Sequence, residues 1–235
     1  MKLLNTILCA SILTVSCKKE GTGGRASISG VIYEVLIDHN GDEVERRVAQ
    51  DKKVFISYGD NTVVNDDVDS DGQGEFKFDY LTRGDYTISA YSDCIVCSTE
   101  EDVIEHSLTV SKTDQDVKQD IVIRKVVDPE DGSAMISGTL MIQKYLGNTP
   151  FGDPFVAQDE DVFIKYGSDE VHFEKTETGA DGRFMFRELI KGSYTIYAYS
   201  TCDTCVNVLE NKQVTVEVTS NGQIIDVGEL ITETP

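Results

Sequence analysis

The sequence predicts an all-β protein with two tandem β-sandwich domains behind an N-terminal secretory signal. Three observations predict it: a short apolar segment at the N-terminus, a long internal repeat, and runs of alternating apolar and polar residues between Gly, Asp and Asn turns. Alternation with a period of two is typical of half-buried strands, and several short strands within about 100 residues are typical of a sandwich.

The N-terminus has the three parts of a secretory signal. Met1-Lys2 is positively charged, residues 3–16 are mostly apolar, and the chain becomes polar from Cys17 onward. The apolar part is shorter than the roughly 20 residues that a membrane-spanning helix needs. We therefore predict a signal peptide at 1–16 that is cleaved before Cys17.

Residues 13–17, Leu-Thr-Val-Ser-Cys, resemble a lipobox, the site where signal peptidase II cleaves and a diacylglyceryl group is added to the cysteine. The usual pattern has Leu three residues before the cysteine. Here Thr14 takes that place and Leu13 precedes it, which is similar to the looser lipoboxes of the Bacteroidetes. The resemblance implies a lipid on Cys17 that anchors the protein at the outer membrane, on its periplasmic or outer surface. The alternative is an ordinary secretory signal with a chance cysteine.

The charge of the chain limits its partners. The chain has 42 acidic residues against 21 basic ones and a formal charge of −21, and cleavage would remove one lysine and leave residues 17–235, enough for two ordinary domains. Such a chain is not expected to bind nucleic acid, which requires Lys/Arg patches for the phosphates. The charge indicates a well-solvated exterior, and the more specific alternative is that the acidic residues bind cations. Trp is absent, so a carbohydrate platform built on Trp is not expected.

The repeat keeps one constant offset, which places Ile136 on Ile28 and identifies a tandem duplication. We predict a tether at 17–25, repeat 1 at 26–125, a linker rich in Pro, Gly and acidic residues at 126–133, and repeat 2 at 134–235. The matching segments include Ile28-Ser29-Gly30 with Ile136-Ser137-Gly138, Val54-Phe55-Ile56 with Val162-Phe163-Ile164, Tyr86-Thr87-Ile88 with Tyr194-Thr195-Ile196, and Cys94 and Cys97 with Cys202 and Cys205.

Each repeat contains a similar succession of expected strands. Two Phe residues in each, Phe76 and Phe78 or Phe184 and Phe186, alternate with polar residues and are expected to fill the core between the sheets. Loss of such a core Phe would cost about 3–5 kcal/mol. The strands are expected at 54–58, 75–78, 86–91, 107–110 and 119–123 in repeat 1, and at 183–186, 194–199, 214–218 and 224–227 in repeat 2.

This order of motifs resembles the carboxypeptidase regulatory-like, or prealbumin-like, domain. The motifs are Ile-Ser-Gly, Val-Phe-Ile-x-Tyr-Gly, Asp-Gly, Phe-x-Phe, Leu-x-x-Gly and Tyr-Thr-Ile, and they cover nearly the whole mature chain. The resemblance implies a transthyretin/Ig-like sandwich in each repeat, with Asp71-Gly72 and Asp181-Gly182 at corresponding hairpin turns. It is more distantly similar to the B-type repeats of Gram-positive surface adhesins. Such domains act as spacers, stalks and protein-contact modules, and the fold alone does not decide among these.

Two Cys-x-x-Cys pairs are the first candidate site: Cys94 with Cys97, and Cys202 with Cys205. A disulfide within each loop is expected for an extracytoplasmic protein. A four-thiolate zinc site is an alternative, but it requires the two loops to meet. Redox catalysis is a third interpretation, which the acidic neighbours disfavour because they raise a thiol pKa. Disulfides between the repeats also remain open.

The acidic segment 67–75 is the second candidate. Asp67, Asp69, Asp71 and Glu75 resemble the ligands of a DxDxDG calcium loop. Phe78 stands where the bidentate Glu of an EF-hand should be, and repeat 2 lacks the pattern. The alternative is an acidic hairpin turn. Residues 38–42, which contain Asn-Gly, are likewise expected to form a hairpin turn.

The remaining residues give no sign of catalysis. His39, His106 and His172 have no counterparts in the other repeat and are expected at the surface, and no phosphate loop, nucleophile elbow or HExxH motif occurs. The sequence therefore favours a non-enzymatic, membrane-anchored lipoprotein of the cell envelope that acts as a spacer or contacts a protein or glycan. The alternatives are a lipoprotein that binds calcium or zinc, and an extracytoplasmic thiol-disulfide redox protein.

Overall fold

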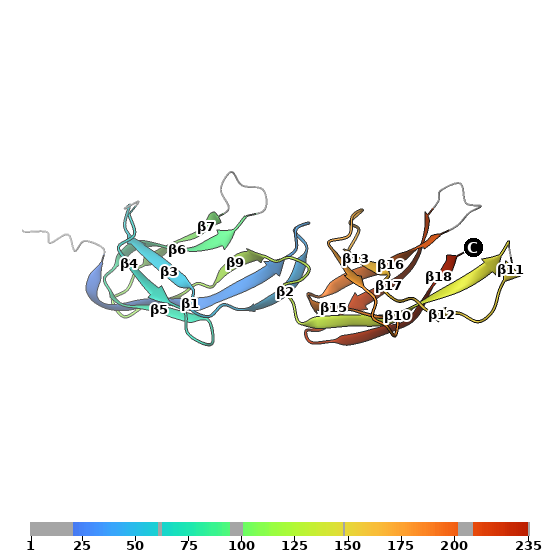
Figure 1. Ribbon diagram of the computed structural model, residues 1–235. Coiled ribbons are helices and arrows are strands. Elements are labelled where there is room, and N and C mark those ends of the chain that lie inside the picture. The colour runs from blue at the N-terminus through green and yellow to red at the C-terminus, as the bar shows by residue number, and fades with distance from the viewer. Residues whose placement is uncertain (1–20, 61–62, 95–100, 148, 202–208, 235) are drawn as a thin grey trace, which may run out of the picture. The chain divides into compact units, whose positions relative to one another are not determined.

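The computed structural model describes residues 21–60, 63–94, 101–147, 149–201 and 209–234 (Figure 1). Every regular element in these residues is a β-strand, so the predicted all-β class is confirmed. None of the described residues belongs to a helix that is long and apolar enough to cross a membrane.

The contacts divide the chain into two compact units. Unit 1 contains the described residues of 21–33, 48–92 and 101–123, and unit 2 contains those of 34–47, 93–94 and 124–234. This division does not follow the repeats, because the end of the first strand and the strand after it group with unit 2, where Leu36 joins the core. The segment predicted as a tether also ends in strand structure, since Thr22–Arg25 belong to the first strand. The repeat limits remain predictions from the sequence.

Repeat 1 forms two sheets. The first strand, β1 (Thr22–Ile37), is central in one sheet, and the other sheet has the order β4-β3-β6-β7. The strands that pair with β1 are β2 (Glu43–Val48), β5 (Glu75–Leu81), β8 (Asp116–Lys118) and β9 (Ile121–Val126). The second sheet contains β3 (Lys53–Tyr58), β4 (Asp66–Asp69), β6 (Gly84–Asp93) and β7 (Glu101–Val110).

Repeat 2 also forms two sheets, and its four-stranded sheet has the same strand order as that of repeat 1. Each of the strands β13 to β17 begins at the residue that the sequence repeat aligns with the start of its counterpart among β3 to β7, as Asp161 does with Lys53. The sheet around β10 (Ala134–Leu146) also contains β11 (Thr149–Pro150), β12 (Phe155–Val156), β15 (Arg183–Leu189) and β18 (Ile224–Thr234). The other sheet contains β13 (Asp161–Tyr166), β14 (Glu174–Glu177), β16 (Gly192–Thr201) and β17 (Leu209–Val218), in the order β14-β13-β16-β17.

Each repeat contains a parallel pairing. Ile28 of β1 lies beside Val117 of β8, and Ile136 of β10 lies beside Ile225 of β18. The other pairings for which a register is defined are antiparallel. Each sandwich therefore joins the first strand of its repeat to a strand near the end of that repeat.

The cores are built by the expected alternation. Phe76 and Phe78 are buried in repeat 1, as are Phe184 and Phe186 in repeat 2, while the residues between them are exposed. This confirms the expected core role of the Phe pairs.

A tyrosine in each core is bonded at one end of the sandwich. The hydroxyl of Tyr86 lies 2.8 Å from the carbonyl oxygen of Thr82, and the hydroxyl of Tyr194 lies 3.0 Å from that of Ile190. Each hydroxyl is also near a carbonyl much earlier in the chain, that of Gly21 at 3.3 Å or Pro129 at 3.2 Å. Burial raises the pKa of Tyr194 far above its usual value, so the hydroxyl stays protonated and can donate.

The turns repeat as well, and they correct one expected correspondence. Gly74 and Gly182 both have a φ of 73°, which favours glycine, and the repeat offset aligns them with each other. Asp181-Gly182 therefore corresponds to Gln73-Gly74 rather than to Asp71-Gly72. The hairpin turn expected at 38–42 is confirmed, because β1 and β2 pair and Gly41 has a φ of 87°.

The tyrosine bond can be tested with Tyr194→Phe. The variant keeps the ring but removes the hydroxyl that satisfies buried carbonyls, so unfolding free energy should fall by about 1 kcal/mol. Urea denaturation of the full chain measures the change. Tyr199→Phe, in which the ring is half exposed, is the matched control and should change stability little. Equal effects of the two substitutions would contradict the role of the buried hydroxyl.

Backbone strain can be tested with Glu188→Gly. Glu188 has a φ of 59°, and its counterpart Tyr80 has a φ of 62°. Glycine should relieve about 1–2 kcal/mol of backbone strain, whereas its extra conformational entropy in the unfolded chain costs roughly 0.5–1 kcal/mol. The free energy of unfolding should therefore rise by about 0.5 kcal/mol. Thermal denaturation measures it. Glu217→Gly, on the exposed face of β17, should instead destabilise.

Candidate functional site

The predicted cysteine sites fall mostly outside the described residues. Cys94 directly follows β6, whereas Cys97, Cys202 and Cys205 lie in segments that the structure does not describe. Cys17 and the signal peptide at 1–16 are outside it too. The disulfides, the zinc site, the redox interpretation and the lipidation of Cys17 therefore stay predictions.

Two acidic residues of the calcium candidate are in contact with a lysine. Asp67 and Asp69 lie on β4, and the neighbouring strand β3 places Lys53 between them. The Lys53 Nζ donates to Asp67 Oδ2 at 2.6 Å and to Asp69 Oδ1 at 3.2 Å. The bonds to Asp67 and then Asp69 raise the pKa of Lys53, so the ammonium stays charged. A built-in cation thus occupies the place between these carboxylates.

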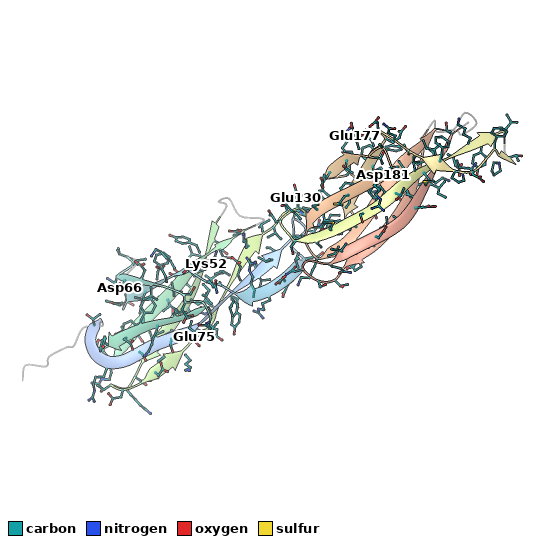
Figure 2. The ribbon with its side chains drawn as sticks, turned by 60° about the horizontal axis from the view of Figure 1, so that its bottom comes forward. Lys52, Asp66, Glu75, Glu130, Glu177 and Asp181 are labelled. Atoms are coloured by element: carbon teal, nitrogen blue, oxygen red, sulfur yellow. The ribbon has the colours of Figure 1, made fainter. Side chains whose placement is uncertain are left out.

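The other two acidic residues belong to the turn before β5. Asp71 Oδ1 accepts hydrogen bonds from the backbone N–H groups of Gln73 and Glu75, each at 2.9 Å. Glu75 begins β5 and is exposed (Figure 2). Among the described residues, no three His, Cys, Asp or Glu side chains gather as a metal site would require. The geometry favours the hairpin-turn interpretation over calcium ligation.

Two histidines make specific contacts instead of being simply solvated. Within unit 2, His39 Nε2 is 3.0 Å from Asp169 Oδ1, and His172 Nδ1 is 3.1 Å from the hydroxyl of Tyr197. His106 lies on β7 and is partly exposed. No sequence motif predicts these contacts, because each joins residues that are far apart in the sequence.

Unit 2 also has an aromatic cluster that the sequence analysis missed: Phe163, His172, Tyr197 and Tyr199. The rings of Phe163 and Tyr197, paired across β13 and β16, are stacked with centroids 5.2 Å apart and planes 18° from parallel. Tyr199 meets both rings edge-on, at 5.4 Å from Phe163 and 5.6 Å from Tyr197. His172 lies 4.7 Å from Phe163. The aromatic cluster covers part of the outer face of the sheet that contains β13 and β16.

The aromatic cluster combines a buried ring with an exposed one. Tyr197 is 5% exposed and Tyr199 is 46% exposed. Burial, and secondly the proximity of Tyr199, raises the pKa of Tyr197 to about 12. The equivalents of Phe163 and Tyr199 in repeat 1 are Phe55 and Tyr91, whose rings are 5.5 Å apart.

The other two members of the aromatic cluster have no aromatic counterpart. Ser89 stands where repeat 2 has Tyr197, and Val64 stands where it has His172. Comparison of the repeats at the fixed offset was the one sequence signal that would have found the cluster.

Each repeat also has a shallow hollow on the outer face of its first sheet, around Gly30 and Gly138. Their volumes are about 350 Å³ and about 400 Å³, respectively. A Cβ on Gly30 would collide with the carbonyl oxygen of Gln119, and one on Gly138 would lie 2.6 Å from Cζ of Phe184. The neighbouring atoms thus leave no room for a side chain at Gly30 or Gly138, and glycine is required at the floor of both hollows.

No protein-family model and no curated protein matches the chain. Among solved structures, it is similar to the Bacillus anthracis TIE protein, with 14% identity, a TM-score of 0.33, and coverage of 88% of this chain and 34% of that chain. It is also similar to a streptococcal ancillary pilin, with 11% identity, a TM-score of 0.33, and coverage of 89% and 63%. A third is the minor pilin GBS52 of Streptococcus agalactiae, with 13% identity, a TM-score of 0.31, and coverage of 89% and 97%. The chain thus spans about a third of the first protein and less than two thirds of the second. No family membership follows from likenesses at this level.

The competition between Lys53 and calcium can be tested by thermal denaturation with and without millimolar calcium. The wild-type melting temperature should not change, because the ammonium already compensates Asp67 and Asp69. Lys53→Met leaves two neighbouring carboxylates without a cation, so it should lower the melting temperature and make calcium raise it again. A calcium-induced rise in the wild type that Asp67→Asn removes would contradict this interpretation.

Proposed function

We propose that the chain is a non-catalytic contact module of the cell envelope, in which unit 2 carries the contact surface. One observation carries the proposal: the repeats keep the same strands, turns and core bonds at one constant offset, while their outer faces differ. Since core and turns are shared, the extra aromatic residues of unit 2 are not needed to build the sandwich. Tyr and other aromatic residues with a half-exposed ring are typical of protein contact surfaces.

The polar side chains that the fold brings together have structural uses. The buried Ser70 donates to the carbonyl of Ala49 at 2.6 Å, and its counterpart Thr178 donates to that of Ala157 at 2.7 Å. The buried carboxylate of Asp38 accepts two backbone N–H bonds in the β1–β2 turn. These groups hold turns and strand ends in place, which supports a scaffold rather than an active site.

Attachment to the envelope is part of the proposal and rests on the lipobox-like segment that ends at Cys17. A diacylglyceryl group with an added acyl chain would hold the chain stably at a membrane, because each buried CH₂ contributes about 0.8 kcal/mol. Only residues 17–21 would then separate the lipid from β1.

The contact role can be tested by photo-crosslinking in the source cells. A photoreactive phenylalanine at Tyr199 should give a discrete crosslinked product, because this ring is on the outer face of the aromatic cluster. The same residue at Tyr91, the counterpart in repeat 1, is the matched control and should give much less. Equal crosslinking from the two positions, or none from Tyr199, would contradict unit 2 as the contact domain.

The lipid anchor can be tested in the same cells by fractionation. Cys17→Ala should move the protein out of the membrane fraction, and its retention there would contradict the lipid anchor.

A further inference from the structure

We propose that the hollow of unit 2 binds an acidic saccharide, with its arginines on the carboxylates of uronic acid units. The inference rests on the proposed contact role of unit 2 and names a ligand class for one of its surfaces. It starts from a comparison of the two hollows, which the same strands build in each repeat.

The outward-facing rows of the two hollows differ in charge at nearly every position. In repeat 1, Ser29 lies between Lys77 of β5 and Lys118 of β8, so the central row is basic. Acidic residues stand on either side along β5, at Glu75 and Asp79. Lys77 and Asp79 form an ion pair of 2.9 Å. The charges of this hollow thus compensate one another.

In repeat 2 the arrangement of charges is reversed: the central row has no basic residue, and the flanking residues on the strand are basic. Ser137 lies between Met185 of β15 and Asp226 of β18. Arginines replace the flanking acids, with Arg183 in the place of Glu75 and Arg187 in the place of Asp79. The hollow thus holds two guanidinium groups around an apolar thioether. The exposed carboxylates of Glu177 and Asp226 also line it, so its formal charges balance.

The guanidinium of Arg187 is the group that points most directly to a ligand. Its described contact is the Met185 sulfur, 3.1 Å from Nε, and a thioether is a weak acceptor. In repeat 1 the equivalent residue, Asp79, pairs with Lys77. In repeat 2 Met185 stands in the place of that lysine, so the contact of Arg187 involves no opposite charge. Arg183 is 3.6 Å from Asp181, and both of these side chains are largely exposed. Because the two arginines are four residues apart on β15, about 13 Å along the strand, they fit two carboxylates of an oligosaccharide rather than one.

The rest of the hollow fits a sugar ring better than an acidic peptide. Ser137 and Thr139 line it with hydroxyls, and the exposed carboxylates of Glu177 and Asp226 can accept from a donor. Sugar hydroxyls supply such donors, whereas the carboxylate side chains of an acidic peptide can only accept hydrogen bonds. Met185, 39% exposed, offers an apolar surface for the C–H face of a ring. The volume of about 400 Å³ is within the usual ~300–1,000 Å³ of small-molecule sites.

Titration calorimetry of the purified full mature chain with trigalacturonate tests the proposal. One equivalent should bind, and Arg183→Glu with Arg187→Asp, the residues of repeat 1, should weaken binding at least about tenfold. Lys77→Glu with Lys118→Glu removes the same amount of positive charge from the repeat 1 hollow and should leave binding nearly unchanged. Arg187→Lys should have an intermediate effect, because it keeps the charge but loses the paired donors.

The proposal would be overturned by no binding of trigalacturonate, by binding that the double arginine variant leaves intact, or by equal binding of the neutral trisaccharide maltotriose. Hexaglutamate binding as tight as trigalacturonate would assign the hollow to acidic peptides instead and would also overturn it. Failure here is distinguishable from failure of the contact role, because crosslinking from Tyr199 does not depend on Arg183 or Arg187. Melting temperatures of the variants show whether each remains folded.

Discussion

Both sandwiches depend on a buried tyrosine hydroxyl that must find a hydrogen-bond partner inside the core. Left unsatisfied, such a group would cost about 1–3 kcal/mol. Tyr86 and Tyr194 meet the requirement by reaching back to the turn before their own strand and to a carbonyl of the segment that precedes the first strand of the repeat. Three segments are thereby joined at one end of each core. The position of this bond and the Phe rows beside it define a scaffold that the duplication preserved.

The scaffold separates what the fold requires from what it leaves free to vary. Gly30 and Gly138 are required by close packing at the floor of the hollows, and Gly74 and Gly182 are favoured by their positive φ. The side chains on the outer faces have no such constraint. There Glu75 corresponds to Arg183, and Ser89 corresponds to Tyr197. Divergence between the copies therefore falls on the surfaces, which is where a second copy can acquire a role that the first does not have.

The sequence predicted the features that arise from local patterns. Alternation identified the Phe rows, and the Asn-Gly pair identified the turn after β1. It did not predict features that depend on which strands are neighbours. Asp67 and Asp69 looked like calcium ligands because the register that brings Lys53 between them cannot be read from their own segment. The aromatic cluster was missed for the same reason, since Phe163, His172 and Tyr197 come from three different elements. The saccharide candidate appears only when both rows of a hollow are compared.

The parallel pairing of the first strand with a late one has a consequence for how the chain folds. Ile28 pairs with Val117 and Ile136 with Ile225, so neither sandwich can be completed before its last strands have been made. Contacts of such high sequence separation slow folding, because the chain loses loop entropy before the pairing compensates for it. During synthesis, each N-terminal strand therefore keeps one edge unpaired until the late strand is made, and an unpaired edge can join strands of other chains. The abundance of acidic residues in the waiting chain opposes that association through charge repulsion.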